Sequence, residues 1–199
     1  MVLSHIWGIY THPKQEWKKI AERHESVVNS ISHTVFISLI PALCSYYSSV
    51  YLGWDIGANN RLFLTSESAL AVSILMFCGL FGGVIGLGLM AHWMAHSFEA
   101  TPSHVQSIEV SAYTATPIYM VGFAALYPEL WFLICVGFAG LAYAIYMLYT
   151  GVPIIMGIDE NRGFIYASSL VTVGLVFLVS MMGLTVFLWT AGIGPEIAG

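Results

Sequence analysis

Charge is the scarcest property of this 199-residue chain. Only 9% of its residues are charged and 58% are hydrophobic, whereas an ordinary soluble domain carries about 25% charged residues. Such a chain cannot cover a water-exposed surface with polar side chains, but it can face lipid. The small net charge of −5 and the lack of a basic face argue against nucleic acid as a partner.

Cysteine is scarce too. Cys44, Cys78 and Cys135 stand far apart in apolar runs, a spacing that predicts neither a disulfide framework nor a CxxC metal site. Residues 1–33 are mixed in composition and hold no apolar core of a cleavable signal peptide. Targeting is therefore expected from the first membrane-spanning helix.

Catalytic motifs are also missing. The sequence has no GxSxG, no P-loop and no GxGxxG in a suitable strand–helix context. Its candidate membrane carboxylates stand only at the ends of apolar runs, which weakens proton-coupled transport as a function: Glu67, Glu99, Glu109 and Glu129. We therefore expect that the protein is not an enzyme.

Long apolar runs are abundant. A helix needs about 20 apolar residues to cross the hydrocarbon core, and inside lipid its backbone must satisfy its own hydrogen bonds. We predict an all-α polytopic membrane protein in which residues 34–199 form a bundle of five transmembrane helices. None of the five runs contains Asp, Glu, Lys or Arg: Thr34–Gly53, Ser68–Met94, Val110–Leu126, Leu130–Val152 and Phe164–Ala191.

The few positive charges are unevenly placed. Four of the six Lys/Arg residues lie within residues 14–23. If the N-terminus is inside, Arg162 joins them on the inner side, and the outer side holds only Arg61. Since cytoplasmic loops carry an excess of Lys and Arg, the pattern predicts a cytoplasmic N-terminus and a C-terminus on the opposite side.

Residues 1–33 have a pattern of their own. Apolar residues such as Trp17 and Ile20 recur at helical spacing between charged ones, and Thr11 with Pro13 is a typical helix start. This segment is predicted to form an amphipathic helix on the inner membrane surface. The alternative is a solvated helix that leads directly into the first span.

Glycines are spaced four apart in the second apolar run. The pairs Gly79/Gly83 and Gly82/Gly86 match the small-xxx-small pattern that lets helix backbones approach closely in lipid. The pattern is typical of a subunit interface or, equally, of packing within one subunit. It favours a homo-oligomer, for which twofold symmetry is the commonest arrangement.

Histidines mark the end of the same run. His92, His96 and Glu99 are spaced i, i+4, i+7 and would share one face of a continuous helix. Imidazole and carboxylate ligands at this spacing could bind a divalent transition metal. The competing interpretation is that these residues simply mark the polar end of a long helix.

The third run is interrupted by proline. Pro117 would free backbone carbonyls that nearby threonine hydroxyls can bind, and broken helices near the middle of the membrane are a feature of transporter sites. The candidate transport residues are Tyr113, Thr114, Thr116, Pro117 and Tyr119. The alternative is a kink that only serves packing.

Several short motifs in order along nearly the whole chain point to a family. They are His5-Ile6-Trp7-Gly8 with His12-Pro13 and Trp17, Leu52–Gly57, Tyr113–Pro117 with Tyr127-Pro128, and Tyr146 followed by Leu148-Tyr149 and Gly151-Val152-Pro153. Together they resemble the Yip family (Ypt-interacting proteins), most closely its short bacterial inner-membrane branch.

The resemblance implies five spanning helices, a cytoplasmic N-terminus and a periplasmic C-terminus in the bacterial inner membrane. Eukaryotic members are linked to Rab-type GTPases and vesicle traffic, a role that a bacterial chain would have no partner for. The resemblance brings no catalytic residue, and the histidine cluster is not among its motifs.

Two functions follow as hypotheses. The first is a non-enzymatic scaffold or membrane-organising protein that associates through its helices with itself or with other membrane proteins. The second is a small channel or transporter for an ion such as a divalent metal. Its pathway would pass the Thr114–Pro117 kink, with His92, His96 and Glu99 at the cytoplasmic mouth. Apart from such a metal ion, no cofactor is expected.

Overall fold

The computed structural model describes residues 8–23, 27–55, 61–192 and 194–198. Its described α-helices are α2 (Pro13–Arg23), α3 (Val27–Tyr47), α4 (Ser66–Ala95), α5 (His104–Met120), α6 (Leu130–Met156) and α7 (Glu160–Thr190). A π-helical turn η1 (Ser48–Leu52) extends α3, and 3₁₀ turns η2 (His96–Phe98) and η3 (Val121–Leu126) follow α4 and α5. The strands β1 (Trp54–Asp55) and β2 (Arg61–Leu62) pair antiparallel between η1 and α4.

Local polar residues fix where the helices start. The Thr65 hydroxyl accepts a hydrogen bond from the Ser68 N–H at the start of α4, and Asp159 accepts one from the Arg162 N–H at the start of α7. Ser103 and Gln106 form a reciprocal capping box on α5. These caps satisfy backbone donors that the first helical turn leaves without intrahelical partners.

Four of the described helical segments are long and apolar enough to cross a membrane: Val27–Leu52, Ser66–Phe98, Leu130–Met156 and Glu160–Thr190. This confirms the all-α membrane architecture. The third predicted span, Val110–Leu126, is different, because it is divided between the 17-residue α5 and the 3₁₀ turn η3. Helix α3 also begins before residue 34, where we placed the start of the transmembrane domain.

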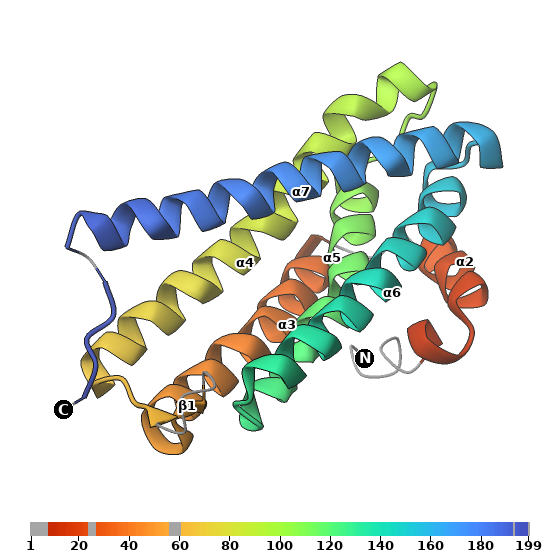
Figure 1. Ribbon diagram of the computed structural model, residues 1–199. Coiled ribbons are helices and arrows are strands. Elements are labelled where there is room, and N and C mark those ends of the chain that lie inside the picture. Colours follow the sequence, from red (N-terminus) through yellow and green to blue (C-terminus); the bar gives the residue numbers. More distant parts are fainter. Residues whose placement is uncertain (1–7, 24–26, 56–60, 193, 199) are drawn as a thin grey trace.

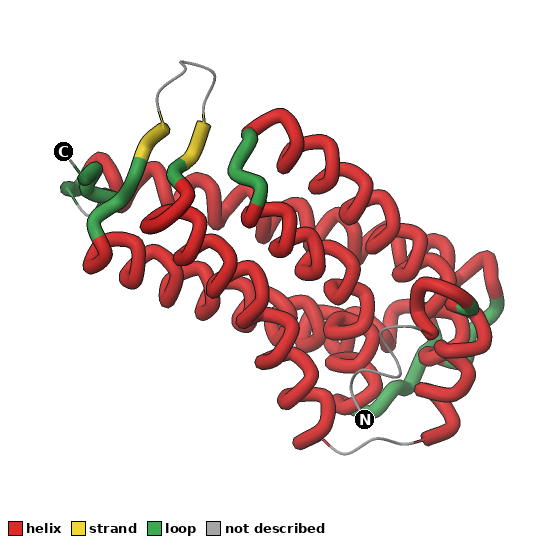
Figure 2. The backbone as a smooth tube through the Cα atoms, turned by 90° about the horizontal axis from the view of Figure 1, so that it is seen from below, coloured by secondary structure: helices red, strands yellow, loops and turns green. Residues whose placement is uncertain are grey.

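The connections between the helices lie at two opposite ends of the molecule (Figures 1 and 2). At the hairpin end, the Asp55 N–H bonds the Pro128 carbonyl at 3.0 Å, and the Thr65 N–H bonds the Glu196 carbonyl at 3.1 Å. This end therefore holds the β-hairpin, the α5–α6 turn and the C-terminal tail. The opposite end, which we call the basic end, holds α2 and the α4–α5 and α6–α7 connections.

The larger of two buried clusters lies toward the basic end. It joins residues of α2, α5, α6 and α7, among them the fully buried Trp17, Tyr113, Met147 and Tyr166. The Tyr166 hydroxyl donates to the Ala91 carbonyl, which ties α7 to α4. Beyond this cluster α7 loses its cover: no residue from Val171 to Thr190, a range described throughout, is buried. We call this range the α7 arm.

Helix α2 packs onto α6 through one close contact. A Cβ atom added at Gly151 would lie 2.3 Å from the Trp17 ring, so only glycine leaves room for the indole. Trp17 and Ile20 are buried in the protein, while Lys14 and Lys18 are exposed. The apolar face of the predicted amphipathic helix therefore covers the bundle, and its position at the membrane surface stays a prediction.

The Gly151→Leu variant tests this contact. The added side chain must displace Trp17, and overpacking of this kind costs about 1–3 kcal/mol, so the thermal midpoint in detergent should fall by roughly 3–10 °C. Trypsin should also cut faster at Lys14 and Lys18. Gly137→Leu, on the same helix but with open space around it among the described residues, is the control. Equal midpoints and cleavage rates for the two variants would show that α2 is not held by this contact.

Candidate functional site

Helices α3 and α5 meet through polar side chains, although the chain as a whole is apolar. Four polar residues of α3 and five of α5 are buried, and His33 of α3 contacts Thr116 of α5. We call this set the polar seam: Ser30, His33, Thr34, Ser38, Ser107, Glu109, Ser111, Thr114 and Thr116. Ionisable groups inside a membrane are costly and are usually kept for a function, which makes the seam the candidate functional site.

His33 lies at the centre of the seam and is 1% exposed. Its Nε2 atom lies 2.9 Å from the Thr116 hydroxyl oxygen, and its ring centroid lies 4.5 Å from that of Tyr113. The Thr116 hydroxyl already donates its single hydrogen to the Ala112 carbonyl at 3.0 Å. Nε2 must therefore carry a hydrogen and donate to Thr116.

The hydroxyl groups of the seam are satisfied unequally. Thr34 donates to the Ser30 carbonyl at 2.8 Å and Ser111 to the Ser107 carbonyl at 2.9 Å, each one turn back along its own helix. The buried hydroxyls of Ser38 and Thr114 have no hydrogen-bond partner among the described residues. The seam therefore offers both fixed and unused hydrogen-bonding groups inside the bundle.

The predicted transport residues do not all face the same helix in the structure. Tyr113, Thr114 and Thr116 are buried, and Tyr113 and Thr116 contact His33. Pro117 lies inside α5, where it lacks the N–H that would bind the carbonyl one turn back. Tyr119 instead faces α4, because its hydroxyl donates to the Leu80 carbonyl at 2.7 Å.

The three predicted metal ligands do not share a helix face. Helix α4 ends at Ala95, His96 begins a 3₁₀ turn, and Glu99 adopts a left-handed backbone conformation with a φ of 57°. The His92 ring lies against His104 of α5, with 3.7 Å between their centroids. Among the described residues, no group of three or more His, Cys, Asp or Glu side chains could hold a metal ion.

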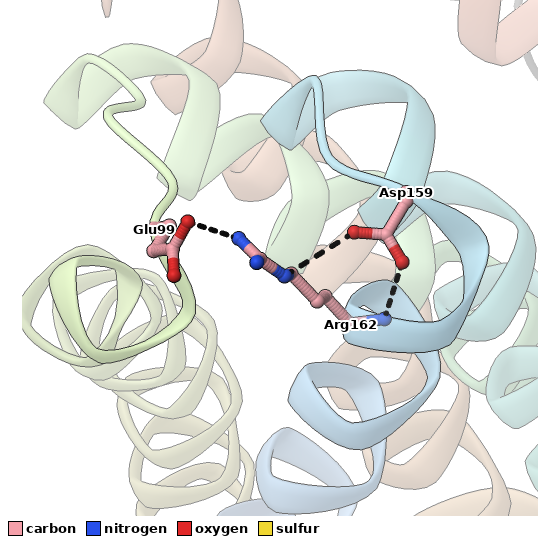
Figure 3. Close-up of polar contacts among 3 residues, drawn as sticks. All are labelled: Glu99, Asp159 and Arg162. Carbon is pink, nitrogen blue, oxygen red and sulfur yellow. Dashed lines mark hydrogen bonds and ion pairs between the residues drawn. The ribbon is translucent and has the colours of Figure 1, made fainter.

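Glu99 has an ionic partner instead. Its carboxylate accepts a hydrogen bond from the Arg162 guanidinium, which also lies 3.4 Å from the Asp159 carboxylate (Figure 3). The Arg162–Glu99 pair joins the α4–α5 connection to the start of α7 at the basic end, and the Arg162–Asp159 pair lies within the start of α7. Both pairs are solvent-exposed, so they contribute little to stability.

The glycines of α4 serve two purposes. Cβ atoms at Gly79 and Gly86 would contact Met181 and Phe177 of the α7 arm, at 2.3 and 3.2 Å. At Gly82 and Gly83 an added Cβ would meet no described atom within 4 Å. Two of the four glycines thus pack within one subunit, and the other two have space beside them.

Two ionisable members of the seam were not predicted as site residues. His33 was placed before the first span, and Glu109 was treated only as a carboxylate at a span end. A helical repeat of polar residues was the available signal, since Ser30, Thr34 and Ser38 are spaced four apart. Such a repeat places the three side chains on one face of a helix.

Thr116→Val and Thr114→Val form a matched pair that tests the seam. Both replace a hydroxyl by a methyl group, but only Thr116→Val removes the acceptor of the His33 Nε2–H bond. An unsatisfied buried donor costs about 1–3 kcal/mol, so Thr116→Val should lower the thermal midpoint by roughly 2–8 °C. Thr114→Val should leave it unchanged or raise it. Equal effects would show that the His33 bond does not hold α3 to α5.

Comparison with known proteins agrees with the resemblance seen in the sequence. The Yip1 domain family matches residues 7–181. The chain is 32% identical to the inner membrane protein YohC of Escherichia coli K12 over 191 residues, 96% of this chain and 98% of that protein, and equally to YohC of E. coli strain CFT073. No solved structure matches the chain. The four long apolar helices and the YohC relatives together indicate a multi-pass protein of the inner membrane. The chain belongs to the Yip family.

Proposed function

We propose that this protein is a non-enzymatic organiser of the inner membrane that acts by lateral association of α4 and the α7 arm. One observation carries the proposal. The α7 arm contacts α4 at Gly79 and Gly86 but has none of its own residues buried, and the neighbouring Gly82 and Gly83 of α4 have open space beside them among the described residues. A second copy of the chain is the simplest partner, and other membrane proteins are further partners of the same kind.

Membrane physics supports this assignment. Lipid tails are as apolar as leucine, so helices in a bilayer associate through close packing of small residues rather than through the hydrophobic effect. The large side chains of the α7 arm supply contact area, because Val179, Met182, Phe187 and Trp189 are all more than half exposed. Glycines on α4 would let a partner helix approach the backbone.

We also propose five membrane crossings with the N-terminus in the cytoplasm and the C-terminus in the periplasm. Helices α3, α4, α5, α6 and α7 connect the basic end and the hairpin end alternately. Although α5 has only 17 residues, it and η3 together extend roughly 37 Å, which exceeds the hydrocarbon core of about 30 Å. Lys14, Lys18 and Arg162 at the basic end and Arg61 near the hairpin agree with this orientation.

Native cysteines provide a direct test of association. Cys78 lies one turn before Gly82 on α4 and is exposed, Cys135 is exposed on α6, and Cys44 is buried. Mild oxidation of membranes should produce a disulfide-linked dimer through Cys78. The dimer should disappear in Cys78→Ala and persist in Cys135→Ala. Gly82→Leu should weaken it, whereas Gly137→Leu should not. Absence of a Cys78-linked dimer, or linkage through Cys135 alone, would contradict association through α4.

Transport is a second candidate, favoured by one observation. The polar seam places His33 and Thr116 in hydrogen-bond contact inside the bundle, where a proton or a small cation could be bound. Its members Thr114 and Thr116 and the neighbouring Tyr113 belong to the predicted pathway, and His92 and His96 lie toward the basic end, where the predicted mouth would be. Every residue of the seam is buried, which is why we rank transport second.

Flux through liposomes separates the two functions. For an organiser, purified protein should give no flux of protons or divalent cations above that of protein-free liposomes. Flux that His33→Gln abolishes and Thr114→Val retains would establish transport through the seam and would replace the proposed function.

A further inference from the structure

An apolar groove runs between the end of α5 and the middle of α6. Its volume is about 380 Å³, which falls within the range of ligand-binding pockets, roughly 300–1,000 Å³. One wall is formed by Pro117 and Val121, the other by Val136 and Ala139, and Tyr10 closes one side. Apart from Pro117, which belongs to the predicted transport residues, its lining residues are part of neither the polar seam nor the α4–α7 face.

Close contacts of Gly140 and Tyr143 shape the groove. A Cβ atom at Gly140 would lie 2.4 Å from Val121, so glycine is needed where the two walls meet. The Tyr143 hydroxyl donates to the Ile9 carbonyl at 2.8 Å, and the Tyr143 ring stacks on Tyr10 with centroids 5.3 Å apart. Burial, and secondarily the neighbouring Tyr143, raises the pKa of Tyr10 above its ordinary value. Tyr10 therefore lines one side of the groove and is held there by its contact with Tyr143.

Two exposed lysines, Lys14 and Lys18, lie on α2, which packs on α6 beyond Tyr143. The N-terminal segment contacts α6 at Tyr143 through Tyr10 and at Gly151 through Trp17, two positions that lie about 12 Å apart along the helix. Lys14 and Lys18, one turn apart on α2, are exposed, and Lys18 is the residue next to Trp17. Half the thickness of a hydrocarbon core is about 15 Å. The helix that carries the lysines is thus anchored to α6 at a distance from Tyr143 that is close to half the thickness of the hydrocarbon core.

We propose that the groove binds one acyl chain of an anionic phospholipid whose phosphate lies at Lys14 and Lys18. The apolar lining excludes a polar ligand, because it offers no free charged group to pair with one. Exposed lysines close to a membrane surface attract anionic lipid, and Lys19 is already paired with Glu16 at 3.2 Å. An acyl chain with an anionic headgroup satisfies both parts of the site at once.

Two alanines of α6 provide a matched pair of variants. Ala139 lines the groove, whereas Ala142 is exposed on the same helix outside it. Ala139→Phe should fill the groove and Ala142→Phe should not, and neither changes a buried position. The full-length protein, purified in mild detergent, is mixed with phosphatidylglycerol or phosphatidylcholine of equal chain length, and bound lipid is counted by native mass spectrometry.

The wild-type protein and Ala142→Phe should retain one phosphatidylglycerol in preference to phosphatidylcholine, and Ala139→Phe should retain neither above background. Lys14→Gln with Lys18→Gln should remove the preference, about fivefold in affinity per lysine, while a neutral lipid still occupies the groove. Equal retention by Ala139→Phe and Ala142→Phe would overturn the acyl-chain site. Loss of dimer instead of lipid in Ala139→Phe would assign the groove to a second copy and would also overturn the proposal.

Discussion

The contact between Trp17 and Gly151 is the constraint on which the organisation of the basic end depends. Because glycine leaves room for the indole, α2 can lie directly on α6, and the buried indole also meets the Tyr113 ring edge-on at 6.3 Å. Tyr113 in turn contacts His33, which bonds Thr116. One aromatic side chain on the N-terminal segment thus reaches α6, α5 and, through α5, the polar seam on α3.

The polar seam shows how an apolar membrane protein accommodates buried polar side chains between its helices. The bundle has few charges, and polar groups between membrane helices must find partners within the protein. The seam meets this need locally, since several of its hydroxyls bond carbonyls of their own helix. The bond from His33 to Thr116 joins two helices. It therefore fixes the relative position of α3 and α5, which hydroxyl groups bonded to their own helices cannot do.

The sequence alone predicted those helices that have a local signal. It did not predict the features that depend on contacts between helices. Apolar runs predicted α4, α6 and α7 to within four residues at each end, because membrane crossing requires such runs. The same reasoning placed the start of the first span at Thr34, after the polar residues Ser30 and His33, whereas α3 begins at Val27 because those residues are buried against α5. The shared helix face of His92, His96 and Glu99 was inferred from an uninterrupted helix, but α4 ends at Ala95. No local pattern revealed that His92 would face His104 or that Glu99 would pair with Arg162.

The two faces that we assign to partners are physically independent. The α4–α7 face is open because no residue of α7 beyond Leu170 is buried, although Phe177 and Met181 still contact α4. The groove lies on the α5–α6 side, beneath a segment held by Tyr143 and Trp17. A lipid bound at the groove would therefore leave the α4–α7 face free. It would act instead on the docking of α2, since Lys14 and Lys18 belong to the helix that Trp17 anchors. Attraction of these lysines to an anionic surface would hold α2 against α6, where the Trp17 indole fills the space beside Gly151.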